Sequence, residues 1–271
     1  MNDLNIGFIG GGNMARAMIA GLLTAGLKPR AISVGEPLAT LRERLSKDFG
    51  VVATADNAAV AASADALVLA VKPQELRAIL TALRPQLERR RPLLVSVAAG
   101  IRMASLAQWS PACPIVRAMP NRGALLGAGA TAACAAAGVG APQRELAAQI
   151  LNASGLVVWV PDEAQLDAVT ALSGSGPAYF FLLAEHMASA GTALGLDAAT
   201  SQALAAATLY GAGLLAHADP DMAAQRVAVT SRGGTTEAAL AVFKDANLAG
   251  TVNAAMRAAA ERSEQLARAS T

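Results

Sequence analysis

Up to about residue 160, short apolar runs alternate along the chain with helical patterns. The runs are continuously apolar instead of alternating, which is typical of parallel strands covered on both faces. Because helical segments separate them, they predict an α/β domain with a doubly wound, Rossmann-type sheet over residues 1–161. The strand candidates are the run that starts at Asn5, Ile32–Val34, Val51–Ala53, Ala66–Val71, Leu93–Val97, Ile115–Ala118 and Val157–Val160.

Beyond Pro161 the pattern changes to long helical stretches rich in Ala and Leu, with no convincing strand. We therefore expect an all-helical second domain over residues 162–271. Asp197 suits an N-cap for the stretch Ala198–Ala216, and Asp219-Pro220 marks a break. So much alanine lets helices pack closely but leaves little polar surface, and a large interface between subunits would account for that.

The first strand candidate runs directly into a glycine cluster and then into the helical pattern Met14–Ala25. This order is typical of the phosphate-binding turn of a dinucleotide fold. Gly10 permits the tight turn, Gly12 has no Cβ to obstruct a pyrophosphate, and Ala15 stands where a third glycine would let helix and strand pack closely. The alternative is a turn that needs glycine and binds nothing. The candidate phosphate-binding residues are Gly10, Gly11, Gly12, Asn13 and Met14.

Other distinctive residues follow the ends of predicted strands, where ligands of open α/β sheets bind. Glu36 ends the second strand, and its carboxylate can accept hydrogen bonds from the adenosine ribose hydroxyls. After the fourth strand, the segment Ala70-Val71-Lys72-Pro73 would place Lys72 beside the pyrophosphate or the nicotinamide ribose. The alternatives are a solvent-facing glutamate before Pro37 and a surface lysine.

Two further strand ends suit the nicotinamide half of a cofactor. The small residues Ala98, Ala99 and Gly100 would let a flat ring approach the backbone. Pro120 and Asn121 could form the floor of the nicotinamide site and orient its carboxamide. The alternative for Ala98–Gly100 is a simple tight turn, and the alternative for Pro120 and Asn121 is a structural turn.

In the helical half, the segment Thr230–Thr236 contains Gly233 and Gly234, followed by two threonines, ahead of the helical run Glu237–Phe243. Exposed N–H groups at such a helix start form a site for a small carboxylate. A capped junction between helices is the alternative. Ser173–Pro177 opens another helix with small hydroxyl residues and a proline near its first turn, and it can serve as a cap alone.

Composition limits the remaining possibilities. At 271 residues the chain can hold two domains, and its net charge of +2 gives no case for nucleic acid. Its apolar stretches are shorter than the roughly 20 residues that cross a bilayer, and its N-terminus does not resemble a signal peptide. Cys113 and Cys134 lack ligand-like spacing. We expect a metal-free protein in the cytoplasm, with no nucleic-acid or membrane partner.

Together these segments resemble the pyrroline-5-carboxylate reductase family over the whole chain. The glycine turn and the end of the fourth strand occur in many related reductases, whereas Asp167–Tyr179 and Ser231–Thr236 are specific to this family. The resemblance implies reduction of 1-pyrroline-5-carboxylate to L-proline by hydride transfer from NADPH or NADH to the ring C=N, the last step of proline biosynthesis. It also implies a helical dimerisation domain, homodimers with active sites shared between subunits, and pentamers of dimers.

By the same resemblance, Asn57 contacts the adenosine side of the cofactor. The segment Thr230–Thr236 is then the substrate loop, whose backbone N–H groups bind the substrate carboxylate. The Thr236 hydroxyl is the catalytic group that reaches the ring nitrogen. The family usually has proline where this chain has Arg232, so either the rigidity of the loop differs here or the guanidinium adds a positive charge near that carboxylate. The expected substrate-binding residues are Ser231, Gly233, Gly234, Thr235 and Thr236.

Two other functions remain open from the residues themselves. A hydroxy-acid dehydrogenase of related architecture needs a general acid or base. However, the only lysine beyond residue 100 is Lys244, and neither His186 nor His217 stands in a recognisable motif. Reduction of a protonated C=N creates no oxyanion, so positioning is then the main task. The other alternative is a non-catalytic dinucleotide-binding sensor, against which the intact threonines of the substrate loop argue.

Overall fold

The computed structural model describes residues 4–111 and 113–269. Residues 1–3, on which the signal-peptide expectation partly rests, lie outside them. Contacts divide the chain into two compact units, of which the first comprises residues 1–174 and 259–271 and the second residues 175–258. The sequence-based boundary after residue 161 follows composition, whereas this division follows packing. The two differ over residues 162–174 and over the C-terminal end of the last helix.

The first unit is built on a sheet of eight strands in the order β3-β2-β1-β4-β5-β6-β7-β8 within the described residues. The first six strands are all parallel. Strand order reverses at β1, because β2 and β4 both pair with it, and ligands of such sheets bind at the carboxyl ends of the strands near this reversal. The doubly wound fold is therefore confirmed. The bounds are β1 Ile6–Ile9, β2 Ile32–Gly35, β3 Val52–Thr54, β4 Ala66–Leu69, β5 Leu93–Ser96, β6 Ile115–Met119, β7 Gly129–Ala135 and β8 Gly155–Trp159.

Strand β7 is absent from the sequence-based prediction, and its direction changes the sheet. It pairs antiparallel with β6, with Ala118 opposite Ala133, and β8 pairs parallel with β7. Strands β7 and β8 therefore run opposite to the first six, so the expectation of parallel strands throughout is wrong for the candidate Val157–Val160. The residues of β7 are Gly, Ala, Thr and Cys, most of which have low strand propensity, so pairing with β6 and not local preference makes this segment a strand.

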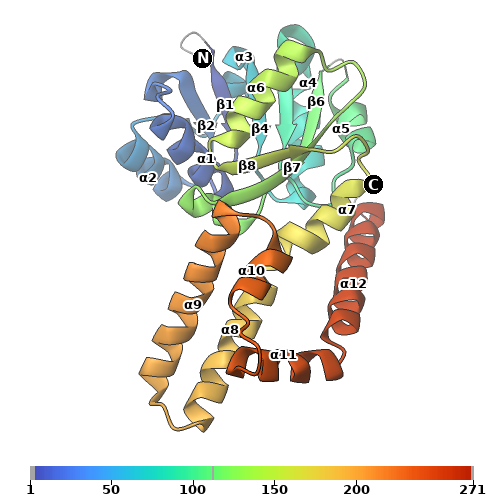
Figure 1. The fold of residues 1–271 in the computed structure, drawn as a ribbon. Coiled ribbons are helices and arrows are strands. Elements are labelled where there is room, and N and C mark those ends of the chain that lie inside the picture. Colours follow the sequence, from blue (N-terminus) through green and yellow to red (C-terminus); the bar gives the residue numbers. More distant parts are fainter. Residues whose placement is uncertain (1–3, 112, 270–271) are drawn as a thin grey trace. The chain divides into compact units, whose positions relative to one another are not determined.

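Helices cover both faces of the sheet, as its continuously apolar strands require (Figure 1). On one face, Phe8 of β1 belongs to a hydrophobic cluster that includes Leu22 of α1. On the other face, Leu69 of β4 shares a second cluster with Leu80 of α4. The helices of this unit are α1 Asn13–Thr24, α2 Ala39–Phe49, α3 Asn57–Ser63, α4 Pro73–Arg90, α5 Met103–Trp109, α6 Ala141–Asn152 and α7 Gln165–Val169, with a 3₁₀ turn at Arg122–Leu126 and a π-helical turn at Thr170–Gly174.

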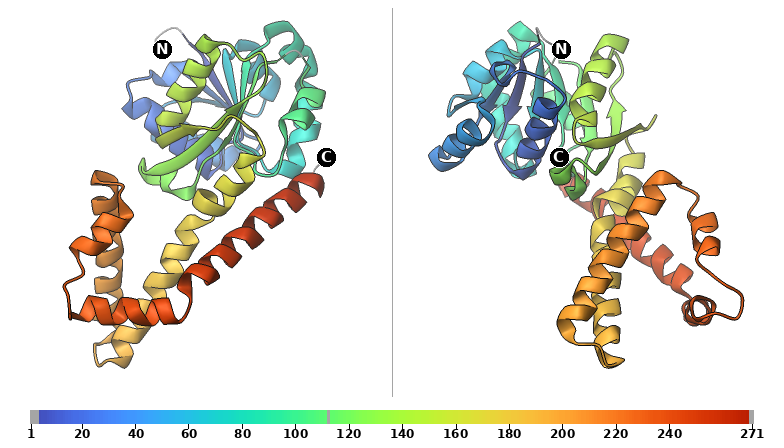
Figure 2. Two further views of the ribbon diagram at one scale, coloured as in Figure 1. Left: turned by 45° about the vertical axis from the view of Figure 1, so that its right-hand side comes forward. Right: turned by 60° about the vertical axis from the view of Figure 1, so that its left-hand side comes forward.

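The described residues of the second unit form helices and connecting loops, with no strand, as predicted. Helices α8 and α9 lie side by side (Figure 2). Asp197 is the N-cap of α9, and the N–H of Thr200 donates to its carboxylate at 2.9 Å. Hydrogen bonds from Thr200 lower the pKa of Asp197, and the helix ends before Asp219-Pro220 as expected. The helices are α8 Gly176–Ala193, α9 Ala198–Ala218, α10 Met222–Ala228, α11 Thr235–Asp245 and the first part of α12 Leu248–Ala269.

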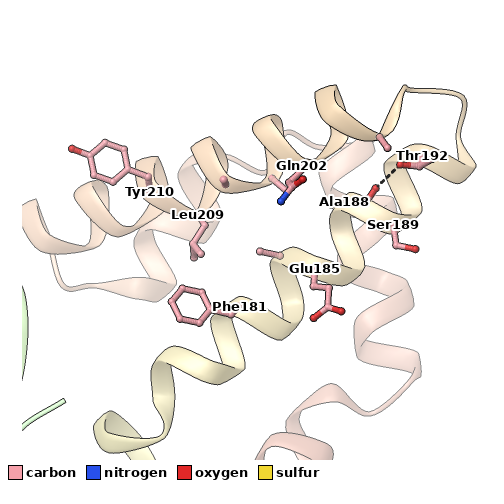
Figure 3. Close-up of a pocket in the computed structure, with 12 residues that line it drawn as sticks. Phe181, Glu185, Ala188, Ser189, Thr192, Gln202, Leu209 and Tyr210 are labelled. Carbon is pink, nitrogen blue, oxygen red and sulfur yellow. Dashed lines mark hydrogen bonds between the residues drawn. The ribbon is translucent and has the colours of Figure 1, made fainter. Parts of the chain in front are cut away.

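Large apolar side chains are exposed along α8 and α9. A groove of about 720 Å³ between them is lined mainly by apolar residues such as Phe181 and Leu209 (Figure 3). Phe180, Leu182 and Leu214 are each more than half exposed. No helix in the described part of the chain is long and apolar enough to cross a membrane.

Both cysteines of the described chain are free thiols held in the protonated form. Burial raises the pKa of the Cys113 thiol from 9.0 to about 11, partly offset by the charge of Arg91. Burial, reinforced by the nearby Glu163 carboxylate, also raises the pKa of Cys134. The thiols therefore behave as small apolar groups at neutral pH.

We expect the stability of the protein to fall between pH 9 and pH 11 in a way that depends on Cys113. The unfolded thiol ionises near 9.0, whereas the folded thiol stays protonated until about 11. Its contribution is therefore complete below pH 9 and is lost as the pH rises to 11. Between about pH 8 and about pH 10.5, the urea midpoint of wild type should fall more than that of Cys113→Ala. Equal falls in the two proteins would contradict this.

Candidate active site

The turn between β1 and α1 requires glycine at its first position. Gly10 has a φ of +96°, and a Cβ added there would lie 2.8 Å from the carbonyl oxygen of Ala70. Its N–H donates to the carbonyl of Gly35 at 2.8 Å, which ties the turn to the end of β2. Gly10 therefore fixes the turn at the point where strand order reverses.

The start of α1 faces open space and fits a pyrophosphate. Gly12 is the N-cap, its position provides no side-chain cap, and a Cβ added there would meet no described atom within 4 Å. Gly12 and Asn13 are exposed. The first N–H groups of a helix lack helical partners and lie at its positive dipole end, so they suit an anionic ligand.

Glu36 is buried against the glycine turn and is only 6% exposed, so it is not the solvent-facing glutamate of the alternative interpretation. Its carboxylate accepts hydrogen bonds from the N–H of Gly11 and the N–H of Leu38, both at 2.9 Å. The Arg42 guanidinium donates to the carbonyl of Glu36 at 2.9 Å. Glu36 therefore holds the turn in shape. Each carboxylate oxygen keeps a second lone pair, so contact with ribose hydroxyls stays a prediction.

Asn57 offers an unused acceptor beside the end of β2. It is the first residue of α3, and its Oδ1 is buried with no hydrogen-bond partner among the described residues. A Cβ added at Gly35 would lie 2.1 Å from this oxygen, so the amide packs directly against the strand end. Because buried acceptors in native proteins are normally paired, this position suits a donor from a ligand.

Two loops contain residues that the sequence predicts for the nicotinamide half of a cofactor, and that role stays a prediction. The N–H of Ala70 donates to the carbonyl of Ile9 at 2.9 Å, and Lys72 is the exposed residue that precedes α4. Gly100 has a φ of +77°, which favours glycine in the loop after β5. Both loops lie at the carboxyl edge of the sheet, because they follow the parallel strands β4 and β5, and Ala99 of the second loop is exposed.

The Asn121 side chain makes hydrogen bonds within the protein that the sequence did not predict. Its Oδ1 accepts hydrogen bonds from the N–H groups of Gly123 and Ala130, both at 3.1 Å. Its Nδ2 donates to the carbonyl of Ser173 at 3.0 Å. This supports the structural-turn interpretation, although one N–H of the amide stays available beside the buried Pro120.

The substrate loop precedes α11, which starts at Thr235 and thus two residues before the predicted run. Gly234 is the N-cap, and Gly233 has a φ of +72°. The N–H of Gly233 donates to Glu237 Oε2 at 2.5 Å, and the N–H of Gly234 donates to the carbonyl of Ser231 at 3.0 Å. Two of the N–H groups expected to bind a carboxylate are therefore engaged inside the loop, and those of Thr235 and Thr236 begin the helix.

Thr236 is half-buried at the second position of α11, and its hydroxyl makes no hydrogen bond to another residue of the described chain. The helix cap is Gly234, so Thr236 is not a side-chain cap. Ser231 and Arg232 are exposed. The loop thus presents an unpaired hydroxyl next to two helix-terminal N–H groups.

The predicted residues fall into two groups in the structure. All cofactor candidates follow strand ends at one edge of the sheet in the first unit, and the substrate loop lies in the second unit. None of these residues lines the groove between α8 and α9. Among the described residues, no group of three His, Cys, Asp or Glu side chains could hold a metal ion.

Two buried charged residues, Arg117 and Asp167, have no role in the sequence-based predictions. Arg117 lies in β6 and is 3% exposed, and Asp167 in α7 is also 3% exposed. The available signal was a charged residue inside the apolar run Ile115–Ala118, because a buried arginine requires a carboxylate or carbonyl partner.

A glycine turn at a topological switch point, with an acidic residue after β2, defines a nucleotide-dependent oxidoreductase of the Rossmann type. Residues 5–100 match the family described as NADP oxidoreductase, coenzyme F420-dependent, and residues 163–266 match the pyrroline-5-carboxylate reductase dimerisation family. The pyrroline-5-carboxylate reductase of Pseudomonas aeruginosa is 45% identical over 98% of both chains. The chain belongs to the pyrroline-5-carboxylate reductase family.

Solved structures agree over the full length. A pyrroline-5-carboxylate reductase from Coxiella burnetii has a TM-score of 0.94 at 40% identity and covers 98% of this chain and 99% of its own. The Plasmodium falciparum pyrroline carboxylate reductase, solved with NADP bound, has a TM-score of 0.83 at 27% identity and covers 98% and 99%. Both the Rossmann unit and the helical unit are therefore shared with this family.

We expect Glu36→Gln to shift cofactor preference toward NADPH, because it removes a negative charge near the ribose and keeps the shape of the side chain. A repulsion of about 1 kcal/mol with the 2′-phosphate corresponds to roughly a five-fold change in the ratio of the two Kd values. Calorimetric titration with NADPH and NADH measures that ratio. Glu43→Gln, an exposed residue of α2, is the control. Equal weakening of both cofactors would mean that Glu36 only holds the turn.

Proposed function

We propose that the protein reduces 1-pyrroline-5-carboxylate to L-proline, the last step of proline biosynthesis. The observation that carries this proposal is the start of α11, where the Thr236 hydroxyl is unpaired beside two helix-terminal N–H groups. Such a site offers N–H donors to a small carboxylate. It also offers a hydroxyl to a ring nitrogen close to that carboxylate in the same substrate.

NADPH or NADH, when bound, supplies the hydride that reduces the carbon of the ring C=N. The substrate carboxylate is bound by the N–H groups of Thr235 and Thr236, supported by the positive dipole end of α11. The Thr236 hydroxyl hydrogen-bonds the ring nitrogen and fixes the orientation of the C=N. Ser231, Gly233 and Gly234 shape the loop, and Arg232 adds positive charge near the carboxylate. No strong acid is required, because protonated C=N is already electrophilic.

The cofactor is held by the carboxyl edge of the sheet. The start of α1 binds the pyrophosphate, and Glu36 and Asn57 serve the adenosine side. The segments Ala70–Pro73 and Ala98–Gly100 line the nicotinamide half, with Pro120 and the remaining N–H of Asn121 beside it. The open, uncapped start of α1 and the unpaired Asn57 oxygen support this assignment.

The functional assembly in this proposal is a homodimer with active sites shared between subunits, further assembled into pentamers of dimers. Exposed apolar side chains on α8 and α9 support an interface, since patches of this kind rarely face water. The match of residues 163–266 to a dimerisation family supports the same unit as the contact region. We place the protein in the cytoplasm, which the two free thiols support.

Purified protein should oxidise NADPH or NADH when 1-pyrroline-5-carboxylate is added, and proline should form in equal amount. Absorbance of the reduced nicotinamide and chromatography of the product measure this. A chelator should leave the rate unchanged. Faster turnover of a 2-keto acid would indicate the hydroxy-acid dehydrogenase instead, and tight cofactor binding without turnover would indicate a sensor.

Thr236→Ala should fold and bind cofactor normally but lose roughly 10- to 100-fold in kcat/KM, because one hydrogen bond of about 1 to 3 kcal/mol is lost. Thr236→Ser, which keeps the hydroxyl, should recover most of the activity. The control is Thr251→Ala, since the exposed Thr251 hydroxyl donates to the backbone carbonyl of Asn247, just before α12. Wild-type kinetics in Thr236→Ala would remove Thr236 from the active site.

A further inference from the structure

Two carboxylates of the first unit, Glu163 and Asp167, are engaged in buried interactions that the proposed function does not use. Glu163 lies just before α7 and Asp167 lies within it, and Asp167 is 3% exposed. Each accepts two hydrogen bonds from residues far away in the sequence. We refer to Glu163 and Asp167 as the carboxylate bracket.

Glu163 joins β6 to the start of α5. Its Oε1 accepts from the N–H of Met103 at 2.7 Å and from the Arg117 guanidinium at 2.8 Å. The Arg117 side chain is 4% exposed, so the ion pair is largely shielded from water. Shielded, charge-assisted hydrogen bonds of this length hold their partners in a narrow range of geometries.

Asp167 joins the loop after β5 to the end of α12. The Arg102 guanidinium donates to its Oδ2 at 2.6 Å, and the Ser263 hydroxyl donates to its Oδ1 at 2.7 Å. Arg102 directly follows the loop that contains Gly100, and a Cβ added at Gly100 would lie 3.7 Å from Leu266 of α12. The loop after β5 is therefore anchored at its far end by the bracket and packs against α12.

The same segment also holds the end of β6. Beyond Asp167 the chain forms the π-helical turn Thr170–Gly174, and the carbonyl of Ser173 accepts the hydrogen bond from Asn121. Irregular turns of this kind are frequent at functional sites. One stretch of chain, residues 163–173, thus binds two of the three strand ends that the proposed function assigns to the nicotinamide half, those of β5 and β6.

We propose that Glu163 and Asp167 are positioning residues, which set the place of the nicotinamide ring by fixing the loop after β5 and the end of β6. This inference rests on the proposed function for the identity of the ring. The adenosine half depends on the turn at β1 and β2, which the bracket does not contact. The two halves of the cofactor therefore have separate supports, and a misplacement of about 1 Å at the ring is enough to slow the transfer strongly.

The test compares NADPH with 2′-phospho-ADP-ribose, a fragment that lacks nicotinamide, by calorimetric titration. The variants are Asp167→Asn and the milder pair Ser263→Ala and Ser263→Thr, of which the last keeps the hydroxyl. The control is Asp65→Asn, which breaks the ion pair with Arg90 in the same unit, at the start of β4 and away from the carboxyl edge.

We expect Ser263→Ala to weaken NADPH binding several-fold, because a less firmly held loop must be ordered when the nicotinamide binds, with fragment binding unchanged. The deuterium isotope effect on kcat should rise, and Ser263→Thr should restore both values. Asp167→Asn should show the larger change, and if it does not fold, the Ser263 pair decides. Equal weakening of NADPH and fragment, or no change in either, would overturn the proposal.

Failure of the proposed function is distinguishable from failure of this inference. Wild-type protein that binds NADPH but does not reduce 1-pyrroline-5-carboxylate would remove the proposed reaction. The comparison of NADPH with the fragment needs no turnover. Weaker binding of NADPH but not of the fragment in Ser263→Ala would therefore still support the positioning role, and equal effects on both ligands would overturn it.

Discussion

The hydrogen bond from the N–H of Gly10 to the carbonyl of Gly35 is the constraint on which the cofactor edge depends. It joins the ends of β1 and β2, while the absence of a Cβ lets Gly10 approach Ala70 after β4. The turn is therefore fixed from both sides of the point where strand order reverses. From this position α1 begins at the carboxyl edge of the sheet, and the Glu36 carboxylate supports the turn by accepting the N–H of Gly11.

The proposed function uses the start of one helix in each unit, α1 in the first and α11 in the second. At α1 the cap is Gly12 and at α11 it is Gly234, and neither helix has a side-chain cap. In both places a serine or aspartate cap is absent, and the proposed function assigns the backbone donors that such a cap would satisfy to an anionic ligand. By contrast, α9 begins with Asp197, whose carboxylate caps the helix by accepting the N–H of Thr200.

The buried charges behind the nicotinamide side have a different physical character from the apolar clusters. Hydrophobic contacts set how much surface is buried but allow several arrangements of similar energy. The two carboxylates and their guanidinium partners permit few arrangements, because a buried charge without its partner is strongly unfavourable. Such a network suits loops whose position matters more than their contribution to stability.

The sequence alone determined the elements whose signals are local. The glycine turn, the continuously apolar strands β1 to β6, the Asp197 cap and the helical character of the second unit all follow from neighbouring residues, because turn geometry, hydrophobic pattern and capping act over one or two turns of chain. Tertiary structure decided the rest. Strand β7 exists because β6 pairs with it, the Glu36 carboxylate turns inward to Gly11, and Asn121 bonds Ser173. The Asp167 carboxylate accepts a hydrogen bond from Ser263. These partners are distant in the sequence, and no local rule identifies which of many polar groups will meet once the chain is folded.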